Sequence, residues 1–389
     1  MAKFAIMGFG TVGGGVAEVL RLNADSIAAK LGEPLELKYI LDVRDLSATA
    51  YADKAVKDFS VIENDPEVEL VVEAIGGARV ALEFTRRALL AGKHVVTSNK
   101  ELVATCGKEL LAIAREKNVN YLFEASVGGG IPVLRPLFQC LAGNQIQEIA
   151  GILNGTTNYI LTRMVTGGVA FADALKEAQA KGYAEADPTA DVEGIDACRK
   201  ICILSNLAWG KEVDPAQVST QGISAIDLQD VAIASAAGYR VKLLGRAMKL
   251  ADGGQCAYVA PHLVPVSCPV STVDDVFNGI MIRGNAVGDV MFYGRGAGDL
   301  PTASAVMGDV IDAIQHREKR RDLGWSESAQ LVDLDTQVPL HWYLRGGFDA
   351  PQGSAQLAEG AMILGPMTRA EARNLAQQLG AKTLLPVFR

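Results

Sequence analysis

Up to about residue 125, short apolar runs alternate with longer segments in which apolar residues recur every three or four positions. The short runs predict buried strands, and the longer spacing predicts helices between them. Strands that alternate with helices in this way are typical of a parallel, doubly wound sheet. The predicted strands span residues 3–7, 35–41, 70–74, 94–97 and 121–124, and the predicted helices span 16–22, 80–91 and 101–118.

The pattern changes after about residue 131, where helical segments mix with β-rich segments. We therefore expect an α/β chain with an N-terminal Rossmann-type sheet and an α+β second domain. A glycine loop at 294–298, followed by a helix through Ile314, is expected to return the chain to the first domain. The helices predicted in the second domain span 171–181, 195–209 and 227–239, and the β-rich segments span 147–153, 241–250, 256–263 and 281–293.

A glycine motif lies between the first predicted strand and the first predicted helix. Gly8, Gly10 and Gly13 form G-x-G-x-x-G. The motif is a specific sign of dinucleotide binding only when it follows a strand and precedes a helix, as it does here. The first glycine permits a tight turn, the second lets a pyrophosphate approach the backbone, and the third lets helix and strand pack closely. The helix start offers unpaired N–H groups and a positive dipole end to phosphates. The motif predicts dinucleotide binding; the alternative is a glycine-rich turn without function.

The end of the second predicted strand carries the residues that select the coenzyme. An acidic residue there holds the ribose hydroxyls of NAD, whereas a nearby arginine accommodates the extra phosphate of NADP. Asp42 and Arg44 are both present, so the pattern is mixed. Because Arg44 is always charged and can bind a phosphate bidentately, we favour NADP slightly and leave use of NAD open.

Three loops follow the carboxyl ends of predicted strands, where such sheets bind their ligands: 75–77, 98–100 and 125–130. Lys100 lies in a polar turn at this edge and is a candidate for contact with cofactor or substrate; the alternative is a solvated lysine at a helix start. The run Gly128–Gly130 is either a linker or a turn that exposes carbonyl oxygens to a small, hard cation.

The segment 178–200 is dense in carboxylates and leads into the predicted helix 195–209. Asp196 and Lys200 lie four residues apart, so they share one helical face. A pair at this spacing is usually a solvated surface ion pair that contributes little. The apolar residues Ile203 and Leu207 on the same face and the glycine motif at the N-terminus favour instead a charged pair at the wall of a pocket. The five clustered acidic residues are Glu185, Asp187, Asp191, Glu193 and Asp196.

Composition narrows the class of protein. The chain has 389 residues and a formal net charge of −8, which argues against nucleic acid or an anionic membrane as partner. No apolar run is long enough to span a bilayer, and the N-terminus lacks the pattern of a secretory signal. The six cysteines are scattered without a C-x-x-C pair, and the four histidines do not suggest a zinc site. We expect a cytoplasmic protein with reduced thiols.

One long motif resembles a known family. The pattern Ala-x₃-Gly-aromatic-small-x₂-Asp-Pro-x₂-Asp-x₂-Gly-x-Asp-x₃-Lys is met throughout 178–200. By it, the chain resembles homoserine dehydrogenases that lack a fused aspartate kinase, over roughly residues 1–320. The resemblance implies reversible, NAD(P)H-dependent reduction of L-aspartate 4-semialdehyde to L-homoserine, on the route to threonine, isoleucine and methionine. Supporting segments are 8–13, 97–100, 124–132, 154–158 and 294–303.

The resemblance also implies residue roles. Lys200 is similar to the family's proton donor and acceptor, Asp196 to the residue that orients lysine and substrate, and Lys100 to a lysine that touches nicotinamide and substrate. Glu185 and Asp191 resemble residues that hold the substrate's amino group and hydroxyl. The backbone carbonyls of Glu124, Val127, Gly129 and Ile131 match a sodium site. The positions that match cofactor contacts are Gly8, Phe9, Gly10, Thr11, Val12, Gly13, Arg44, Ser98, Lys100 and Gly298.

The resemblance, together with these patterns, implies three regions and a homo-oligomer, either a dimer or a tetramer. Residues 1–131 and 298–320 would form the dinucleotide-binding domain, and 132–297 the substrate-binding, catalytic and dimerisation domain. Residues 321–389 would be an abbreviated ACT-like region, which leaves feedback by threonine open. Its predicted elements are a strand at 339–344, a loop rich in glycine and alanine, a helix at 368–379 and a strand at 382–388.

Two other functions fit parts of the sequence. A non-catalytic dinucleotide sensor would keep the glycine motif but would not need both Lys100 and Lys200 beside a carboxylate cluster. A dehydrogenase that oxidises aldehydes through a thioester needs a nucleophilic cysteine near a base. Cys106 and Cys140 lie in no such setting.

Overall fold

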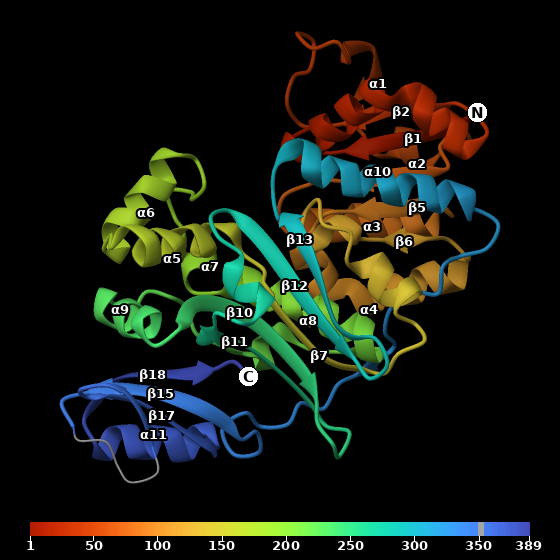
Figure 1. The fold of residues 1–389 in the computed structure, drawn as a ribbon. Coiled ribbons are helices and arrows are strands. Elements are labelled where there is room, and N and C mark those ends of the chain that lie inside the picture. Colours follow the sequence, from red (N-terminus) through yellow and green to blue (C-terminus); the bar gives the residue numbers. More distant parts are fainter. Residues whose placement is uncertain (349–353) are drawn as a thin grey trace. The chain divides into compact units, whose positions relative to one another are not determined.

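The chain folds into two compact units in the computed structural model, which describes residues 1–348 and 354–389 (Figure 1). Each unit is assembled from segments that are distant in the sequence. The first unit consists of 1–143, 206–214 and 295–328, and the second of 144–205, 215–294 and 329–389.

The first unit contains a six-stranded parallel sheet, which confirms the doubly wound arrangement predicted from the alternation of strands and helices. The strand order is β3-β2-β1-β4-β5-β6, so strands are added on both sides of β1. The carboxyl ends of all these strands lie at one edge. The strands are β1 (Ala2–Met7), β2 (Leu35–Leu41), β3 (Ala55–Val56), β4 (Leu70–Glu73), β5 (His94–Thr97) and β6 (Tyr121–Leu122).

The helix predicted at 16–22 is much longer in the structure, because it begins at Thr11 inside the glycine motif and ends at Leu31. Because glycine has low helix propensity, the sequence pattern did not predict that the helix begins within the glycine motif. Packing overrides the propensity: a Cβ on Gly15 would lie 2.9 Å from the Asp299 carbonyl oxygen of a neighbouring helix. The helices of this unit are α1 (Thr11–Leu31), α2 (Ser60–Glu63), α3 (Arg79–Leu90), α4 (Lys100–Lys117) and α10 (Asp299–Gln315).

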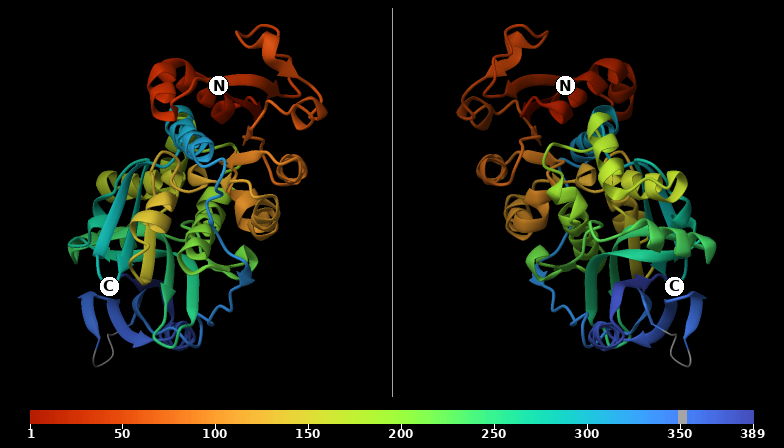
Figure 2. Two further views of the ribbon diagram at one scale, coloured as in Figure 1. Left: turned by 90° about the vertical axis from the view of Figure 1, so that its right-hand side faces the viewer. Right: turned by 90° about the vertical axis from the view of Figure 1, so that its left-hand side faces the viewer.

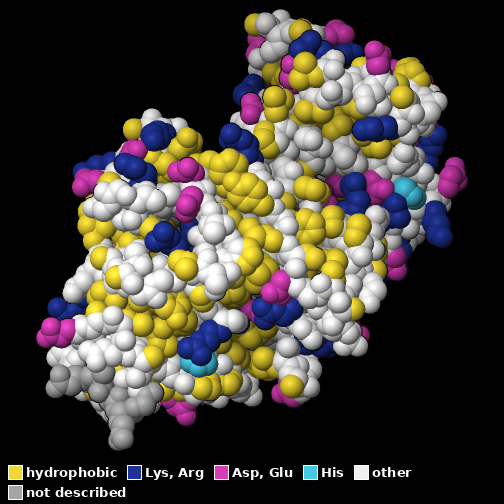
Figure 3. Space-filling view, in the orientation of Figure 1, with side chains coloured by type: hydrophobic (Ala, Val, Ile, Leu, Met, Phe, Trp, Pro, Cys, Tyr) yellow, Lys and Arg dark blue, Asp and Glu magenta, His cyan; other side chains and the backbone are white. Residues whose placement is uncertain are grey.

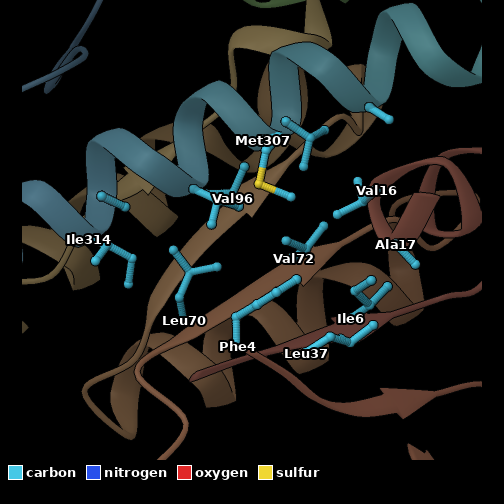
Figure 4. Close-up of a cluster of buried hydrophobic side chains, with 14 of the residues drawn as sticks. Phe4, Ile6, Val16, Ala17, Leu37, Leu70, Val72, Val96, Met307 and Ile314 are labelled. Atoms are coloured by element: carbon cyan, nitrogen blue, oxygen red, sulfur yellow. The ribbon is translucent and has the colours of Figure 1, made fainter. Parts of the chain in front are cut away.

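The core of the first unit lies between this sheet and the two helices α1 and α10 (Figure 4). The teal helix in that view is α10, which comes from the C-terminal third of the chain yet packs on strands near the N-terminus. Its Met307 and Ile314 lie over apolar side chains of the sheet. The buried side chains from the strands and α1 include Phe4, Ile6, Val16, Ala17, Leu37, Leu70, Val72 and Val96.

The second unit is built on a mixed sheet with the order β13-β12-β7-β10-β11-β18-β15-β17-β16, and β9 pairs with β11. The single β-rich segment predicted at 281–293 is a hairpin of two strands. The strands are β7 (Ile146–Ile152), β9 (Ser219–Thr220), β10 (Tyr239–Lys249), β11 (Gln255–Pro265), β12 (Phe277–Gly284), β13 (Gly288–Arg295), β15 (Leu340–Gly346), β16 (Ala355–Ala358), β17 (Ala361–Met367) and β18 (Ala381–Val387).

Helices cover this sheet. The strand β7 ends immediately before α5, and α8 packs on β10, where a Cβ on Gly245 would lie 3.1 Å from the Cβ of Ile201. The helices are α5 (Gly155–Gly167), α6 (Phe171–Ala180), α7 (Thr189–Val192), α8 (Ile195–Trp209), α9 (Leu228–Ala236) and α11 (Arg369–Gln378). The short strands β8 (Lys211–Glu212) and β14 (Glu327–Ser328) pair separately in the first unit.

The C-terminal segment has more strands than the sequence predicted. The expected loop between β15 and α11 contains β16 and β17, and that part of the prediction is wrong; its residues 349–353 lie outside the described part of the chain. The apolar run Ala361–Leu364 is the pattern that predicts β17. In Figures 1 and 2, α11 lies against the strands of this segment, where Ala372 and Ala376 pack on Trp342 and Leu344.

The surface is mixed in charge. On the face seen in Figure 3, basic and acidic side chains are interspersed rather than gathered into one large patch. Within residues 1–348 and 354–389, no helix is both long enough and apolar enough to cross a membrane.

Candidate active site

The three motif glycines lie in a tight turn between β1 and α1. Gly8 has φ +89°, and a Cβ there would lie 2.6 Å from the Ala74 carbonyl oxygen. A Cβ on Gly13 would lie 2.0 Å from the Gly8 carbonyl oxygen, whereas nothing lies within 4 Å of one built on Gly10. The turn therefore needs glycine at its first and third positions, and it leaves open space at the second, where a pyrophosphate would approach. The predicted cofactor residues Phe9, Thr11 and Val12 lie in the same turn and at the start of α1.

A cavity of about 330 Å³ opens beside this turn. It extends from Gly8 and Gly10 to the end of β2 and to the loop after β4. Its volume suits part of a dinucleotide, since ligand pockets commonly measure about 300–1,000 Å³. The lining residues are Gly8, Gly10, Leu41, Asp42, Val43, Arg44, Lys57, Ala74, Ile75, Gly76, Val80 and Phe84.

At the mouth of this cavity, the Asp42 carboxylate accepts four hydrogen bonds. Its donors are the Phe9 N–H at 2.6 Å, the Arg44 N–H at 2.8 Å, and Nε and Nη2 of Arg44 at 3.0 and 2.8 Å. The side-chain bonds from Arg44 come first among the causes that hold the pKa of Asp42 far below its ordinary value. A carboxylate has about four acceptor positions, so those of Asp42 are occupied by its own chain.

Lys57 is a second cation at this cavity and was not among the residues predicted from the sequence. Its ammonium donates to the carbonyl oxygen of Asp42 at 2.9 Å and to that of Arg44. Lys57 directly follows β3, at the same carboxyl edge of the sheet. Periodicity did not predict the two-residue strand that precedes Lys57, so no sequence pattern indicated this position as part of the site.

The loops after β4 and β5 are tied together by Asn99. Its amide donates to the carbonyl oxygens of Ile75 at 3.2 Å and Gly77 at 2.8 Å. Its side-chain oxygen accepts from the Leu102 N–H at 3.0 Å and so caps α4. The neighbouring Ser98 and Lys100, both predicted to contact the cofactor, are half-buried and follow β5 directly.

The loop after β6 makes two successive left-handed steps, with φ +74° at Gly128 and +54° at Gly129. A Cβ on Gly129 would lie 2.5 Å from the Gly296 carbonyl oxygen, so this loop packs tightly on the glycine loop that precedes α10. That second loop ends at Gly298, the N-cap of α10. The carboxylate of Glu124 accepts the N–H groups of residues 133–135 at 2.6–2.7 Å.

Among the described residues, no group of three or more His, Cys, Asp or Glu side chains is placed to hold a metal ion. A cation in the Gly128–Gly129 loop would therefore depend on backbone carbonyl oxygens.

In the second unit, Asp196 and Lys200 form a buried ion pair on α8. The Lys200 ammonium donates to Oδ2 of Asp196 at 2.8 Å and to the Leu153 carbonyl oxygen at 2.7 Å. The side chains are only 9% and 4% exposed, which contradicts the alternative of a solvated surface pair. The carbonyl of Leu153, at the end of β7, and a carboxylate one helical turn away together fix the direction of the ammonium.

Asn154 joins this pair to a second carboxylate. Its Nδ2 donates to Asp191 Oδ1 at 2.7 Å and to Asp196 Oδ2 at 2.9 Å. Its Oδ1 accepts from the Thr157 N–H at 2.9 Å, so the same side chain caps α5. Asn154 lies in a segment that resembles the family, but the sequence predicted no role for it. A polar residue between a strand and a helix is nevertheless a recognisable N-cap.

The other acidic residues of the cluster are placed differently. Asp191 is half-buried beside Asn154, whereas Glu185, Asp187 and Glu193 are exposed. Asp187 accepts from the backbone N–H and hydroxyl of Thr189 at 3.1 and 2.6 Å. The described hydrogen bonds do not join the Glu185 side chain to the lysine pair, so its predicted role requires a bound substrate.

The chain is similar in sequence to known proteins over most of its length. The family model "Homoserine dehydrogenase, NAD binding domain" matches residues 8–124, and the model "Homoserine dehydrogenase" matches residues 132–311. The homoserine dehydrogenase of Neisseria gonorrhoeae is 46% identical over 312 residues, which cover 80% of this chain and 72% of that protein. The Bacillus subtilis homoserine dehydrogenase is 42% identical over 319 residues, 81% and 73% of the two chains.

Solved structures extend the similarity. A homoserine dehydrogenase from Thiobacillus denitrificans has a TM-score of 0.91 at 33% identity, over 100% of this chain and 98% of that one. The chain belongs to the homoserine dehydrogenase family. The enzyme is thus an NAD(P)-dependent oxidoreductase, as its sequence motifs implied. A hyperthermophilic archaeal homoserine dehydrogenase in complex with NADPH has a TM-score of 0.69 at 29% identity, over 80% of this chain and 97% of that one.

Proposed function

We propose that Lys200 is the proton donor and acceptor when this enzyme reduces L-aspartate 4-semialdehyde to L-homoserine, a reaction that it catalyses in both directions. The observation that carries the proposal is the buried Lys200–Asp196 pair, joined through Asn154 to Asp191 in an acid-rich segment. Purified enzyme should oxidise NAD(P)H when the semialdehyde is added. Coenzyme binding without turnover would instead favour the non-catalytic sensor.

The role proposed for Lys200 follows from the charge that develops on the aldehyde oxygen during reduction. The bound coenzyme supplies a hydride to the aldehyde carbon, which leaves negative charge on the aldehyde oxygen. Lys200 would stabilise that charge and transfer a proton to the oxygen, a contribution of about 10²–10⁴ in rate. In the reverse direction a neutral Lys200 would accept the alcohol proton. Asp196 and the Leu153 carbonyl keep the amine in one orientation.

The acidic residues suit the other end of the substrate, which carries an ammonium group. We propose that Glu185 and Asp191 hold the amino group and hydroxyl, and that Lys100 contacts both nicotinamide and substrate. Asp191 is already oriented by Asn154 at 2.7 Å. Glu185, exposed on the loop after α6, is accessible to an incoming ligand.

We propose NADP as the slightly preferred coenzyme. The acceptor positions of Asp42 are filled by Arg44 and the Phe9 N–H, so the ribose hydroxyls of NAD would have to displace a donor. The Arg44 side chain is 57% exposed, and Lys57 adds a second positive charge close by. A phosphate fits this arrangement better than a hydroxyl, because a guanidinium can bind it bidentately.

For Arg44→Ala, we expect the Kd for NADPH to rise about tenfold or more, since a hydrogen bond to a charged group contributes about 1.5–3 kcal/mol. The Kd for NADH should stay the same or fall, because Asp42 would then be available to the ribose hydroxyls. Fluorescence titration measures both, and Arg21→Ala, an exposed arginine of α1, is the matched control. An equal loss for both coenzymes would refute the phosphate role of Arg44.

We also propose a sodium ion held by the backbone carbonyls of Glu124, Val127, Gly129 and Ile131. Hard cations prefer oxygen ligands, and the left-handed steps at Gly128 and Gly129 bend the chain sharply within this set. We expect kcat to be higher in sodium chloride than in choline chloride at the same ionic strength. Equal rates in the two salts would count against the site.

Domain roles are part of the same proposal. We assign dinucleotide binding to residues 1–131 and 298–320, and substrate binding and dimerisation to 132–297, in a cytoplasmic dimer or tetramer. Residues 321–389 would be an abbreviated ACT-like region. Support comes from the order of the described elements, β15-β16-β17-α11-β18, which agrees with a β-α-β-β-α-β unit at every element except the first helix.

A further inference from the structure

Glu73 is a carboxylate in an otherwise apolar strand. It is the last residue of β4, whose sequence is Leu-Val-Val-Glu, and it is 0% exposed. In the sheet it is flanked by Met7 of β1 and Thr97 of β5, which carry no charge. A buried, unpaired carboxylate is costly, so its presence needs an explanation beyond packing.

Both oxygens of Glu73 accept hydrogen bonds from the edge of the sheet where the coenzyme site lies. Oε1 accepts from the Ile75 N–H at 2.6 Å, and Oε2 accepts from the Thr97 hydroxyl at 2.5 Å. The first bond fixes the start of the loop after β4, which lines the dinucleotide cavity. The second fixes the last residue of β5, which leads into Ser98 and Lys100.

These bonds belong to a closed ring. The Thr97 hydroxyl oxygen accepts from the Asn99 N–H at 2.9 Å, and the Asn99 amide donates to the Ile75 carbonyl oxygen at 3.2 Å. The ring therefore runs from Glu73 to Ile75, then to Asn99 and Thr97, and back to Glu73. Each bond of the ring has a side chain as at least one partner, and Glu73 is the charged member of the ring.

We propose that Glu73 is a positioning residue for the coenzyme, which fixes the Ile75–Gly77 loop against the Ser98–Lys100 loop. This inference rests on the proposed coenzyme site. A carboxylate suits the task because it accepts from both loops at once, and bonds to a charged acceptor are roughly twice as strong as neutral ones. A glutamine would accept from only one donor, and the Thr97 hydroxyl hydrogen would lose its acceptor.

Burial raises the pKa of Glu73 to about 7, although the bonds from Thr97 and Ile75 oppose the shift. The Tyr121 hydroxyl of β6 interacts electrostatically with Glu73, and Cys106 of α4 interacts with Tyr121. Burial raises the pKa of Tyr121 well above its usual range. Since the folded protein holds the Glu73 proton more tightly than the unfolded chain, stability falls as pH rises from the ordinary pKa of 4.5 through about 7.

The test is Glu73→Gln in the full-length enzyme. We expect the Kd and KM for NADPH to rise about tenfold at pH 8 while kcat changes less, because coenzyme placement rather than proton transfer is affected. Above pH 7 the variant should melt at the same temperature as the wild type or higher, since glutamine has no charge to bury. Wild-type affinity for NADPH should rise with pH through about 7, and that of the variant should not.

Thr97→Val is the second variant, because it removes the hydroxyl that joins the two loops, and it should raise the Kd in the same direction. Glu67→Gln is the control, since Glu67 lies exposed before the amino end of β4. An unchanged Kd in both variants would overturn the proposal, as would a loss of affinity that only follows a loss of thermal stability. If the Glu73→Gln variant does not fold, the Kd of the Thr97→Val variant for NADPH tests the proposal by itself. Failure of the wild type to bind NADPH would instead refute the proposed coenzyme site.

Discussion

Lys200→Ala is expected to lower kcat by about 10²–10⁴ while the Kd for NADPH remains close to that of the wild type. The alanine cannot stabilise charge on the aldehyde oxygen or supply its proton, whereas the glycine turn that binds the coenzyme is untouched. Steady-state kinetics in both directions and fluorescence titration with NADPH measure the two quantities. Lys176→Ala, an exposed lysine of α6, is the matched control and should leave kcat unchanged.

Stability must be measured alongside, because Lys200 also neutralises a buried carboxylate. Removing one partner of a buried ion pair commonly costs about 3–5 kcal/mol, since the remaining charge is left uncompensated. We therefore expect a lower melting temperature for Lys200→Ala, and assays well below that temperature. Normal kcat in a folded variant would contradict the role assigned to Lys200.

Asn154→Asp is the second substitution with a large expected effect. Aspartate caps helices as well as asparagine does, so α5 should remain intact. The two N–H bonds to Asp191 and Asp196 are lost, and a third carboxylate is placed against them. Bonds to charged groups contribute about 1.5–3 kcal/mol, so we expect kcat/KM to fall at least about tenfold at neutral pH.

The pH dependence of activity distinguishes charge repulsion by the new carboxylate from the loss of the hydrogen bonds to Asp191 and Asp196. A protonated carboxyl can donate one hydrogen bond, so the activity of Asn154→Asp relative to the wild type should recover as pH falls. Asn154→Ser keeps a capping oxygen without the added charge, and its loss should be smaller and should not depend on pH in this way. A larger loss in the serine variant would show that capping, rather than orientation of the carboxylates, is the main role of Asn154.

Local patterns predicted much of the fold because they depend on neighbours in sequence. Apolar runs placed β2 and β5 at their observed limits, and helical spacing placed α8. The start of α1 was not predicted because glycine disfavours helices. Gly15 is needed there because α10 approaches it closely, a contact between segments that are far apart in the chain. The strand β17 was missed because a short apolar run follows a glycine-rich stretch that indicated a loop.

In the candidate site as well, features that depend on neighbours in sequence were predicted, and contacts between distant segments were not. The i,i+4 spacing of Asp196 and Lys200 predicts a shared helical face, but only tertiary structure buries the pair and adds the Leu153 carbonyl. Asn154 and Lys57 act on residues that are close to them only in the folded chain. Glu73 falls within a run that predicts an apolar strand. The register that sets it beside Thr97 is not visible in the sequence, so no role is predicted for it.

The structure of the enzyme with NADP and homoserine bound would test the central claim most directly. The measured quantity is the distance from Lys200 Nζ to the homoserine hydroxyl oxygen. The proposed proton transfer requires a hydrogen bond, about 2.6–3.2 Å between these atoms. A hydroxyl held instead by another side chain, with the amine of Lys200 directed away from it, would contradict this account of the chemistry.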